Sequence, residues 1–219
     1  MRIFLRLTKN SDLIPFNYQP FLTGTLHKWI GKDNLEHGKV SLYSFSWLQN
    51  ADAEKNGLQL NEGSYFFVSA HDKALIRNIV SGIMTDPSVC FGASVNSIEL
   101  KEDPVFPVRQ QFFVASPVFV RMFEKDKCIH LTYENEKSTD YLTETMQRKL
   151  ALADLPVDGV KVSFDKTYPN ATTKLIKYNA IGNRVNWCPI IVEGTPQQVA
   201  FAWNVGVGHS TGIGFGALK

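Results

Sequence analysis

The fold is decided first by residues 2–30, RIFLRLTKNSDLIPFNYQPFLTGTLHKWI, in which one hydrophobic period gives way to another. Over residues 2–8 apolar side chains alternate with polar or aromatic ones, which predicts a strand whose inner face carries Ile3, Leu5 and Leu7. From residue 19 to residue 30 the apolar side chains follow helical spacing, and Gly31 supplies a stop. The chain therefore opens with a strand followed by a helix.

Strand and helix patterns continue to alternate up to residue 100. Strand-like segments occupy residues 40–48, 64–69 and 89–100, and a helical stripe occupies residues 71–84. The order β-α-β-β-α-β is that of a ferredoxin-like domain, a small antiparallel sheet covered by two helices. We therefore assign residues 1–103 to an N-terminal ferredoxin-like domain.

A similar order of elements follows a polar, proline-containing stretch, which we assign to a linker over residues 104–113. Beyond it the patterns predict strands and two helices, the strands over residues 114–123, 129–133, 160–168, 173–181 and 186–193, the helices over 139–152 and 196–203. The predicted fold is α+β, with two tandem ferredoxin-like domains packed side by side. The second spans residues 114–219 and includes a glycine-rich loop.

Composition excludes several classes of protein. Of 219 residues, 44% are hydrophobic and 20% are charged, which is ordinary globular usage and unlike a disordered chain. No apolar run approaches the roughly 18 residues that span a bilayer, so no membrane partner is expected. Arg2 and Arg6 interrupt the apolar N-terminus, which argues against a signal peptide and predicts a cytoplasmic protein. Three scattered cysteines and the lack of an HExxH motif or carboxylate cluster predict no disulfide framework, no metal and no cofactor.

Positive charge gathers in one part of the second half. Residues 160–192 contain five basic side chains against one acidic side chain, Asp165; the basic ones are Lys161, Lys166, Lys174, Lys177 and Arg184. We expect them on a hairpin formed by the strands 160–168 and 173–181. Such a strip suits a phosphate backbone, and it is equally the ordinary composition of a solvated hairpin face. Tyr168 and Tyr178 are either base-stacking platforms or plain strand residues.

The chain ends in a glycine-rich segment, residues 206–216, GVGHSTGIGFG, which holds five of the 15 glycines. It is not a dinucleotide fingerprint, because only seven residues follow Gly212 and no helix fits there. It is not a P-loop, because no Gly-Lys-Ser/Thr is present. Two interpretations are left: a structural glycine hairpin, or a loop whose backbone N–H groups cradle phosphate.

The string Gly206-Val207-Gly208, five residues, then Gly214-Phe215-Gly216 resembles the glycine-rich C-terminal motif of the RAMP superfamily. Within it, the pattern resembles the CRISPR repeat-processing endoribonucleases. Residues 116–121 and 200–204 resemble the opening strand and last helix of that family's second domain. Residues 17–31 and 45–48 resemble the first helix and second strand of its first domain. The resemblance spans nearly the whole chain.

This resemblance implies cleavage of CRISPR precursor RNA within each repeat, without a metal ion. The 2′-hydroxyl before the cut attacks its own phosphodiester, giving a 2′,3′-cyclic phosphate and a 5′-hydroxyl. The reaction needs a base, an acid and a cation. His37 occupies the loop position where the family carries its catalytic histidine, and His27 on the first helix is the expected second histidine. Lys39 is the expected cation, ahead of Lys28 and Lys32.

The sequence departs from the family pattern in one respect, since Glu36 separates Leu35 from His37. Which of His27 and His37 is acid and which is base therefore stays open. The resemblance also implies that RNA contacts the basic hairpin and the glycine-rich segment, the latter through Gly206, Gly208, His209, Ser210, Gly212, Gly214, Phe215 and Gly216.

Three functions compete on this evidence. The first is the metal-independent endoribonuclease, whose partner is CRISPR repeat RNA. The second is a repeat-RNA-binding subunit of a CRISPR effector complex that does not cleave. The third is a ferredoxin-like binder of small molecules, against which the terminal glycine motif argues. The sequence leaves open whether the protein is a monomer or a homodimer.

Overall fold

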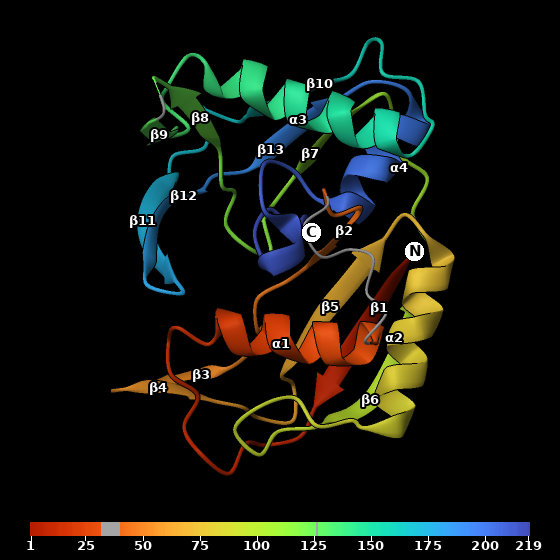
Figure 1. Ribbon diagram of the computed structural model, residues 1–219, viewed down its shortest axis with the longest axis vertical. Helices are drawn as coiled ribbons and strands as arrows, with labels where there is room; N and C mark the ends of the chain where they lie inside the picture. The colour runs from red at the N-terminus through yellow and green to blue at the C-terminus, as the bar shows by residue number, and fades with distance from the viewer. Residues whose placement is uncertain (32–39, 126) are drawn as a thin grey trace.

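The first domain is built on a four-stranded antiparallel sheet in the order β2-β5-β1-β6. Its strands are β1 (Arg2–Leu7), β2 (Tyr43–Phe45), β5 (Tyr65–Ala70) and β6 (Val95–Lys101). In this computed structural model, which describes residues 1–31, 40–125 and 127–219, helices α1 (Gln19–Ile30) and α2 (Lys73–Thr85) cover one face of that sheet (Figure 1). The order of elements confirms the ferredoxin-like prediction, with a small hairpin of β3 (Asp52–Glu54) and β4 (Gly57–Gln59) inserted.

The predicted periodicities explain how this domain packs. Ile3, Leu5 and Leu7 are buried on the helix-covered face of β1, as their alternation predicts. Helix α1 begins and ends where its pattern predicts, and Gly31 follows it with φ +104°, a conformation that favours glycine. Helix α2 is capped by Asp72, whose carboxylate accepts a hydrogen bond from the Ala74 N–H at 2.7 Å.

The second domain repeats the plan with insertions. Its three-stranded sheet has the order β10-β13-β7. The elements are β7 (Arg109–Phe112), α3 (Ser138–Leu152), β10 (Lys161–Phe164), β13 (Ile190–Glu193) and α4 (Pro196–Val205). Two hairpins are inserted, β8 (Arg121–Glu124) with β9 (Lys127–His130), and β11 (Thr172–Tyr178) with β12 (Ile181–Trp187). The fourth strand is reduced to the pairing of Val114 with Leu218.

Strand β7 lies inside the stretch 104–113 that the sequence assigned to a linker. Its sequence, RQQF, has only one buried apolar side chain, Phe112, so its own composition gives no strand signal. The strand exists because its backbone pairs with β13 over four residues. No helix in the described parts of the chain has the length and apolar character needed to cross a bilayer.

The two domains are packed together, and the second covers part of the outer face of the first sheet (Figure 1). Phe67 on β5 packs with Ala115 and Ala217 of the second domain. Arg2 is 2% exposed; its guanidinium lies 3.6 Å from the ring centroid of Trp203 and 3.9 Å from that of Phe67. It also donates to the Trp203 carbonyl at 2.9 Å. Because the second domain covers the outer face of β1 at Arg2, this charged side chain lies within the interface between the domains.

Candidate RNA-binding site

The glycine-rich segment 206–216 lies at the junction of the two domains. After α4 ends, the segment runs through a short 3₁₀ turn, η1 (Thr211–Ile213), and packs against α1 and β2. Three side chains of the first domain donate hydrogen bonds to its carbonyl groups: Gln19 Nε2 to Ile213 at 2.6 Å, Tyr43 Oη to Gly212 at 3.1 Å, and Trp47 Nε1 to Gly214 at 2.8 Å. The segment therefore lies against α1, the helix that carries His27.

Close packing explains the glycines of this segment. A Cβ on Gly216, which has φ +67°, would collide with the carbonyl oxygen of Val207. A Cβ on Gly206 would lie 2.7 Å from the carbonyl oxygen of Gly216, and one on Gly214 would lie 2.8 Å from the Phe45 ring. The N–H groups of these three glycines donate to other carbonyls of the protein. These amides serve the fold, so contact between RNA and the segment stays a prediction.

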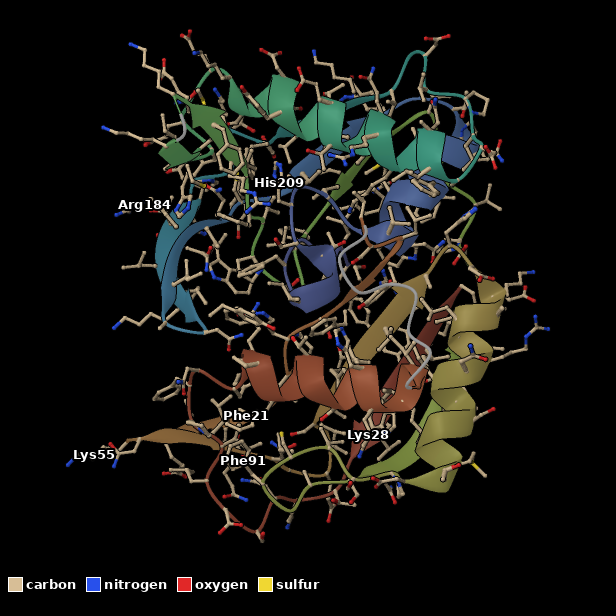
Figure 2. All side chains as sticks on the ribbon, in the orientation of Figure 1. Phe21, Lys28, Lys55, Phe91, Arg184 and His209 are labelled. Atoms are coloured by element: carbon tan, nitrogen blue, oxygen red, sulfur yellow. The ribbon has the colours of Figure 1, made fainter. Side chains whose placement is uncertain are left out.

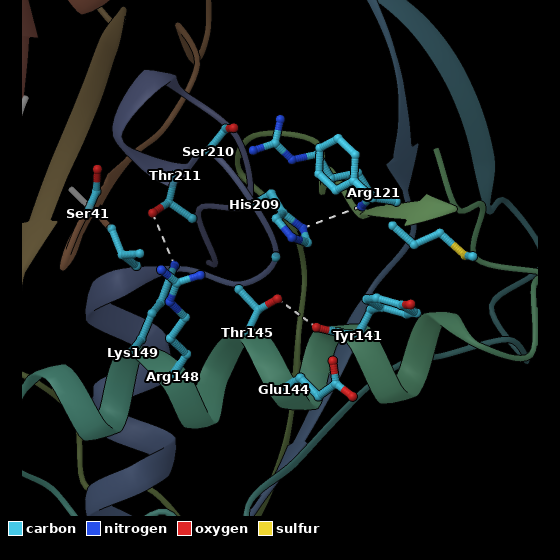
Figure 3. Close-up of a pocket in the computed structure, with 14 residues that line it drawn as sticks. Ser41, Arg121, Tyr141, Glu144, Thr145, Arg148, Lys149, His209, Ser210 and Thr211 are labelled. Carbon is cyan, nitrogen blue, oxygen red and sulfur yellow. Dashed lines mark hydrogen bonds between the residues drawn. The ribbon is translucent and has the colours of Figure 1, made fainter. Parts of the chain in front are cut away.

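A cleft of about 530 Å³ opens on one side of the segment (Figure 3). Its walls come from helix α3, from β8, from residues 208–211 of the segment, and from Val40 and Ser41. Among the residues that the structure describes, three cationic side chains line it, Arg121, Arg148 and Lys149, against one acidic side chain, Glu144. This charge balance suits an anionic ligand such as a phosphate group.

His209 projects into this cleft beside Arg121 (Figure 3). Its Nδ1 accepts a hydrogen bond from the backbone N–H of Arg121 at 3.4 Å, and the backbone N–H of His209 donates to the Phe119 carbonyl at 2.7 Å. Burial, and next the charge of Arg121, lower the pKa of His209 to about 4. The imidazole is therefore neutral near pH 7, and because Nδ1 accepts, the proton is on Nε2. The ring offers the cleft a hydrogen-bond donor.

Lys149 fixes the floor of the cleft. Its ammonium is buried and donates to the carbonyls of Val205 and Gly206 at 3.2 and 3.1 Å and to Thr211 Oγ1 at 3.1 Å. It thereby joins α3 to the C-terminal end of α4, where a cation is favoured by the helix dipole. Burial lowers its pKa to about 7. No ion pair to Lys149 occurs in the part of the chain that the structure describes.

The predicted basic hairpin has a different pairing from the one expected. Strand β11 pairs with β12 around a two-residue turn, whereas β10 pairs with β13, so 160–168 and 173–181 do not form a hairpin. Asn179 and Ala180 both have positive φ, as a tight hairpin turn requires. The basic residues are therefore split, with Lys174, Lys177 and Arg184 on the hairpin and Lys161 and Lys166 outside it.

The two basic residues outside the hairpin lie on or next to β10. Lys161 lies opposite Glu193 in the sheet, and Lys166 Nζ donates to the Glu134 carbonyl at 3.4 Å. On the hairpin, Arg184 lies at the outer side of the molecule (Figure 2). Lys174 Nζ lies 5.9 Å from the ring centroid of Trp187. A role in RNA binding stays a prediction for all five.

Two of the three predicted catalytic residues lie outside the part of the chain that the structure describes. His37 and Lys39, with Lys32, lie outside the described residues. His27 is half-buried on α1 and is not among the residues that line the cleft. Lys28, a reserve candidate for the cation, is held by Asp86 Oδ2 at 2.8 Å and by Ser88.

Sequence reasoning missed the cleft residues of α3 and β8: Arg121, Tyr141, Arg148 and Lys149. A signal existed on α3, because residues 141, 145 and 148 are spaced along one helical face beside the apolar stripe. From the sequence alone, that polar face of α3 has the composition of an ordinary solvated surface. In the structure it lines the cleft together with residues 208–211 of the glycine-rich segment. Within residues 1–31, 40–125 and 127–219, no group of three or more His, Cys, Asp or Glu side chains is arranged to hold a metal ion.

Comparisons with known proteins agree on one family. Over its full length the chain is 27% identical to a Pyrococcus furiosus protein named as a CRISPR-associated endoribonuclease-like protein Cas6, of which it covers 98%. It shares its fold with a structure titled as a Cas6-related gene product from Pyrococcus furiosus, with 24% identity, coverage of 100% and 97% of the two chains, and a TM-score of 0.84. A RAMP protein described as binding different RNA substrates has 21% identity, coverage of 100% and 98%, and the same score.

These neighbours share the tandem ferredoxin-like architecture of the present structure. Residues 100–219, more than half of the chain, match the family described as "CRISPR associated protein Cas6, C-terminal". This stretch contains α3, α4, the cationic cleft wall and the complete glycine-rich segment. The chain belongs to the Cas6 family of CRISPR-associated proteins, and this membership supports a role in processing CRISPR repeat RNA.

Proposed function

We propose that this protein is a metal-independent endoribonuclease that cuts CRISPR precursor RNA within its repeats. The observation that carries the proposal is the cationic cleft lined by Val40 and Ser41 together with the glycine-rich segment. Lys39 directly precedes Val40, and His37 lies three residues before it.

In this reaction the 2′-oxygen forms a bond to phosphorus while the bond from phosphorus to the 5′-oxygen breaks. A base removes the proton of the 2′-hydroxyl and an acid protonates the leaving 5′-oxygen. We assign these two roles to His37 and His27, and the stabilisation of the pentacoordinate phosphorane to Lys39. The products are a 2′,3′-cyclic phosphate and a 5′-hydroxyl, so no water molecule is consumed in the cleavage step.

The cleft supports this proposal by its capacity to hold the phosphate beside the reacting group. Arg121 and Arg148 contribute positive charge, and the neutral His209 contributes an N–H donor. Fixed donors around a site that is partly closed to water stabilise developing negative charge more strongly than the same groups in solution. The relatives named for endoribonuclease-like activity and for RNA binding agree with this assignment.

The test is cleavage of a labelled RNA that carries one CRISPR repeat of the source genome, in buffer with EDTA. We expect cleavage by the wild type and its loss in His37→Ala and His27→Ala. His71→Ala is the matched control, because His71 packs on Phe201 and does not line the cleft. A 2′-deoxy nucleotide before the cut is expected to block the reaction. Cleavage of that RNA, or full activity of the His37 variant, would refute the mechanism.

A second function, repeat-RNA binding without cleavage as a subunit of a CRISPR effector complex, is favoured by one observation. The imidazole that lines the described part of the cleft, His209, has a pKa near 4 and is poorly suited to proton transfer near pH 7. Binding of the intact repeat RNA with no products would support this second function. Failure to bind RNA would refute both. Self-association as a homodimer is a separate prediction, tested by sedimentation with and without RNA.

A further inference from the structure

A second and smaller cavity, of about 210 Å³, lies between the β11–β12 hairpin and the start of α1. Its main lining residues are Phe16, Tyr18, Gln19 and Trp47 from the first domain, and Leu175 and Lys177 from the hairpin. The volume is below the roughly 300–1,000 Å³ of pockets that enclose a drug-sized molecule, so the cavity suits a single ring system.

The floor of this cavity is a fixed aromatic surface. Trp47 donates through Nε1 to the Gly214 carbonyl at 2.8 Å and meets Tyr18 edge-on, with ring centroids 6.1 Å apart. Tyr18 is 4% exposed, and its hydroxyl accepts a hydrogen bond from the Leu48 N–H at 3.1 Å. Because both rings are held by hydrogen bonds and packing, the cavity is formed before any ligand arrives.

The two walls carry exposed apolar side chains. Phe16 is 58% exposed and Leu175 is 61% exposed, and neither belongs to a hydrophobic core of the described structure. The fold therefore gains little from them. Large apolar side chains that flank a cavity are expected where a flat, apolar group is bound between them.

Gln19 adds a polar group whose orientation is fixed. Its Nε2 donates to the carbonyls of Ile213 and Gly214, at 2.6 and 3.3 Å, which assigns the other atom of the amide as Oε1. That oxygen is buried and has no hydrogen-bond partner in the described part of the chain. An unsatisfied buried acceptor is costly, and Gln19 is one of the residues that line the cavity.

Charge favours an anionic ligand at the mouth of the cavity. Lys177 is exposed there, and no acidic side chain is found among the described residues that line it. The cavity also borders the glycine-rich segment, because two of its lining residues, Gln19 and Trp47, donate hydrogen bonds to the Gly214 carbonyl. A nucleic acid that crosses the glycine-rich segment would reach this cavity without leaving the surface.

We propose that this cavity binds one unpaired nucleobase of the RNA, between Phe16 and Leu175. The phosphate adjacent to that base lies against Lys177. The proposal rests on the proposed function in that it requires RNA to be the ligand, but it does not require cleavage. Because stacking is tolerant of base identity, the site recognises an unpaired nucleotide more than one particular base.

The experiment is an abasic walk, in which single nucleotides of the repeat RNA are replaced in turn by abasic ones. Affinity for each RNA is measured by fluorescence anisotropy at one fixed salt concentration, for the wild type, Phe16→Ala and Leu175→Ala. Met84→Ala is the matched control, because Met84 is a 79% exposed apolar residue on α2, away from the cavity. The melting temperature of each variant is measured to check that it folds. Little change is expected, because all three substituted side chains are exposed.

We expect Phe16→Ala to weaken binding of the intact RNA by roughly 5- to 150-fold, the range for loss of one base–aromatic stack. At one RNA position the abasic change should weaken wild-type binding by a similar factor and leave the Phe16 variant unaffected. Normal wild-type binding with no such coupled position would overturn the base site while leaving the proposed function intact. A wild type that binds no RNA would overturn both.

Discussion

Replacing Gly216 by alanine tests whether the glycine-rich segment is part of the packed structure. Gly216 has φ +67°, and an L-residue in this left-handed region costs about 1–2 kcal/mol. In addition, the new Cβ would collide with the Val207 carbonyl oxygen, a backbone atom that cannot rotate away. Overpacking of this kind costs about 1–3 kcal/mol. The expected loss of unfolding free energy is therefore about 2–5 kcal/mol.

Gly159 supplies the matched control for this change. Its φ is +78°, but no heavy atom lies within 4 Å of the Cβ that alanine would add. Gly159→Ala therefore carries the conformational cost alone, and the difference between the variants isolates the collision. In a chain of this size each kcal/mol moves the melting temperature by roughly 2–4 °C, so Gly216→Ala should melt roughly 2–12 °C below Gly159→Ala by circular dichroism. Equal melting temperatures would refute the packing argument.

Three further changes probe the charged residues. Because burial lowers the pKa of Lys149 from 10.5 to about 7, the unfolded chain binds more protons between these values and stability rises with pH. The free energy of unfolding of the wild type and of Lys149→Met is measured by chemical denaturation at pH 7, 8 and 9. The variant should lack the contribution of Lys149 to the rise with pH, up to about 1.4 kcal/mol per pH unit. Parallel pH profiles for the two proteins would contradict this prediction. Arg2→Ala removes a buried hydrogen bond and two ring contacts, and should lower the free energy of unfolding by about 2–4 kcal/mol. The partly exposed Arg6, with one surface ion pair and one longer ring contact, is the control, and Arg6→Ala should lower it by less than about 1 kcal/mol. Equal losses would count against the interface role of Arg2. RNA affinity is measured at several salt concentrations, and Arg184→Ala should reduce the slope of log K against log salt concentration by about 1. Lys55→Ala, on the distant β3–β4 hairpin (Figure 2), is the control and should leave that slope unchanged. An unaltered slope for both variants would exclude Arg184 from the RNA interface.

The order of elements in the first domain was predictable because its patterns are strong and local. The alternation of Ile3, Leu5 and Leu7 and the helical stripe that follows need no distant partner to be recognised. The second domain was harder, since β7 is polar and is a strand only through its pairing with β13. The partner of β10 was also predicted wrongly, because a chain cannot reveal from local pattern that a hairpin is inserted between two paired strands.

The candidate site divides in the same way. The glycine-rich segment could be found from its spacing, and so could the family resemblance that it carries, which the match of residues 100–219 bears out. Its surroundings could not be found, because Arg121 and Lys149 are separated by 28 positions of sequence and meet only where β8 and α3 border the segment.

The sequence by itself determined the alternation of strands and helices, the α+β class and the family, because the hydrophobic period and the glycine spacing are local properties of consecutive residues. Only the tertiary structure decided that the glycines are buried between the domains and that cations gather on one side of them and apolar side chains on the other. The physical reason is that burial, electrostatic field and cavity shape depend on which residues meet across space, and residues distant in the chain carry no local signal of that meeting.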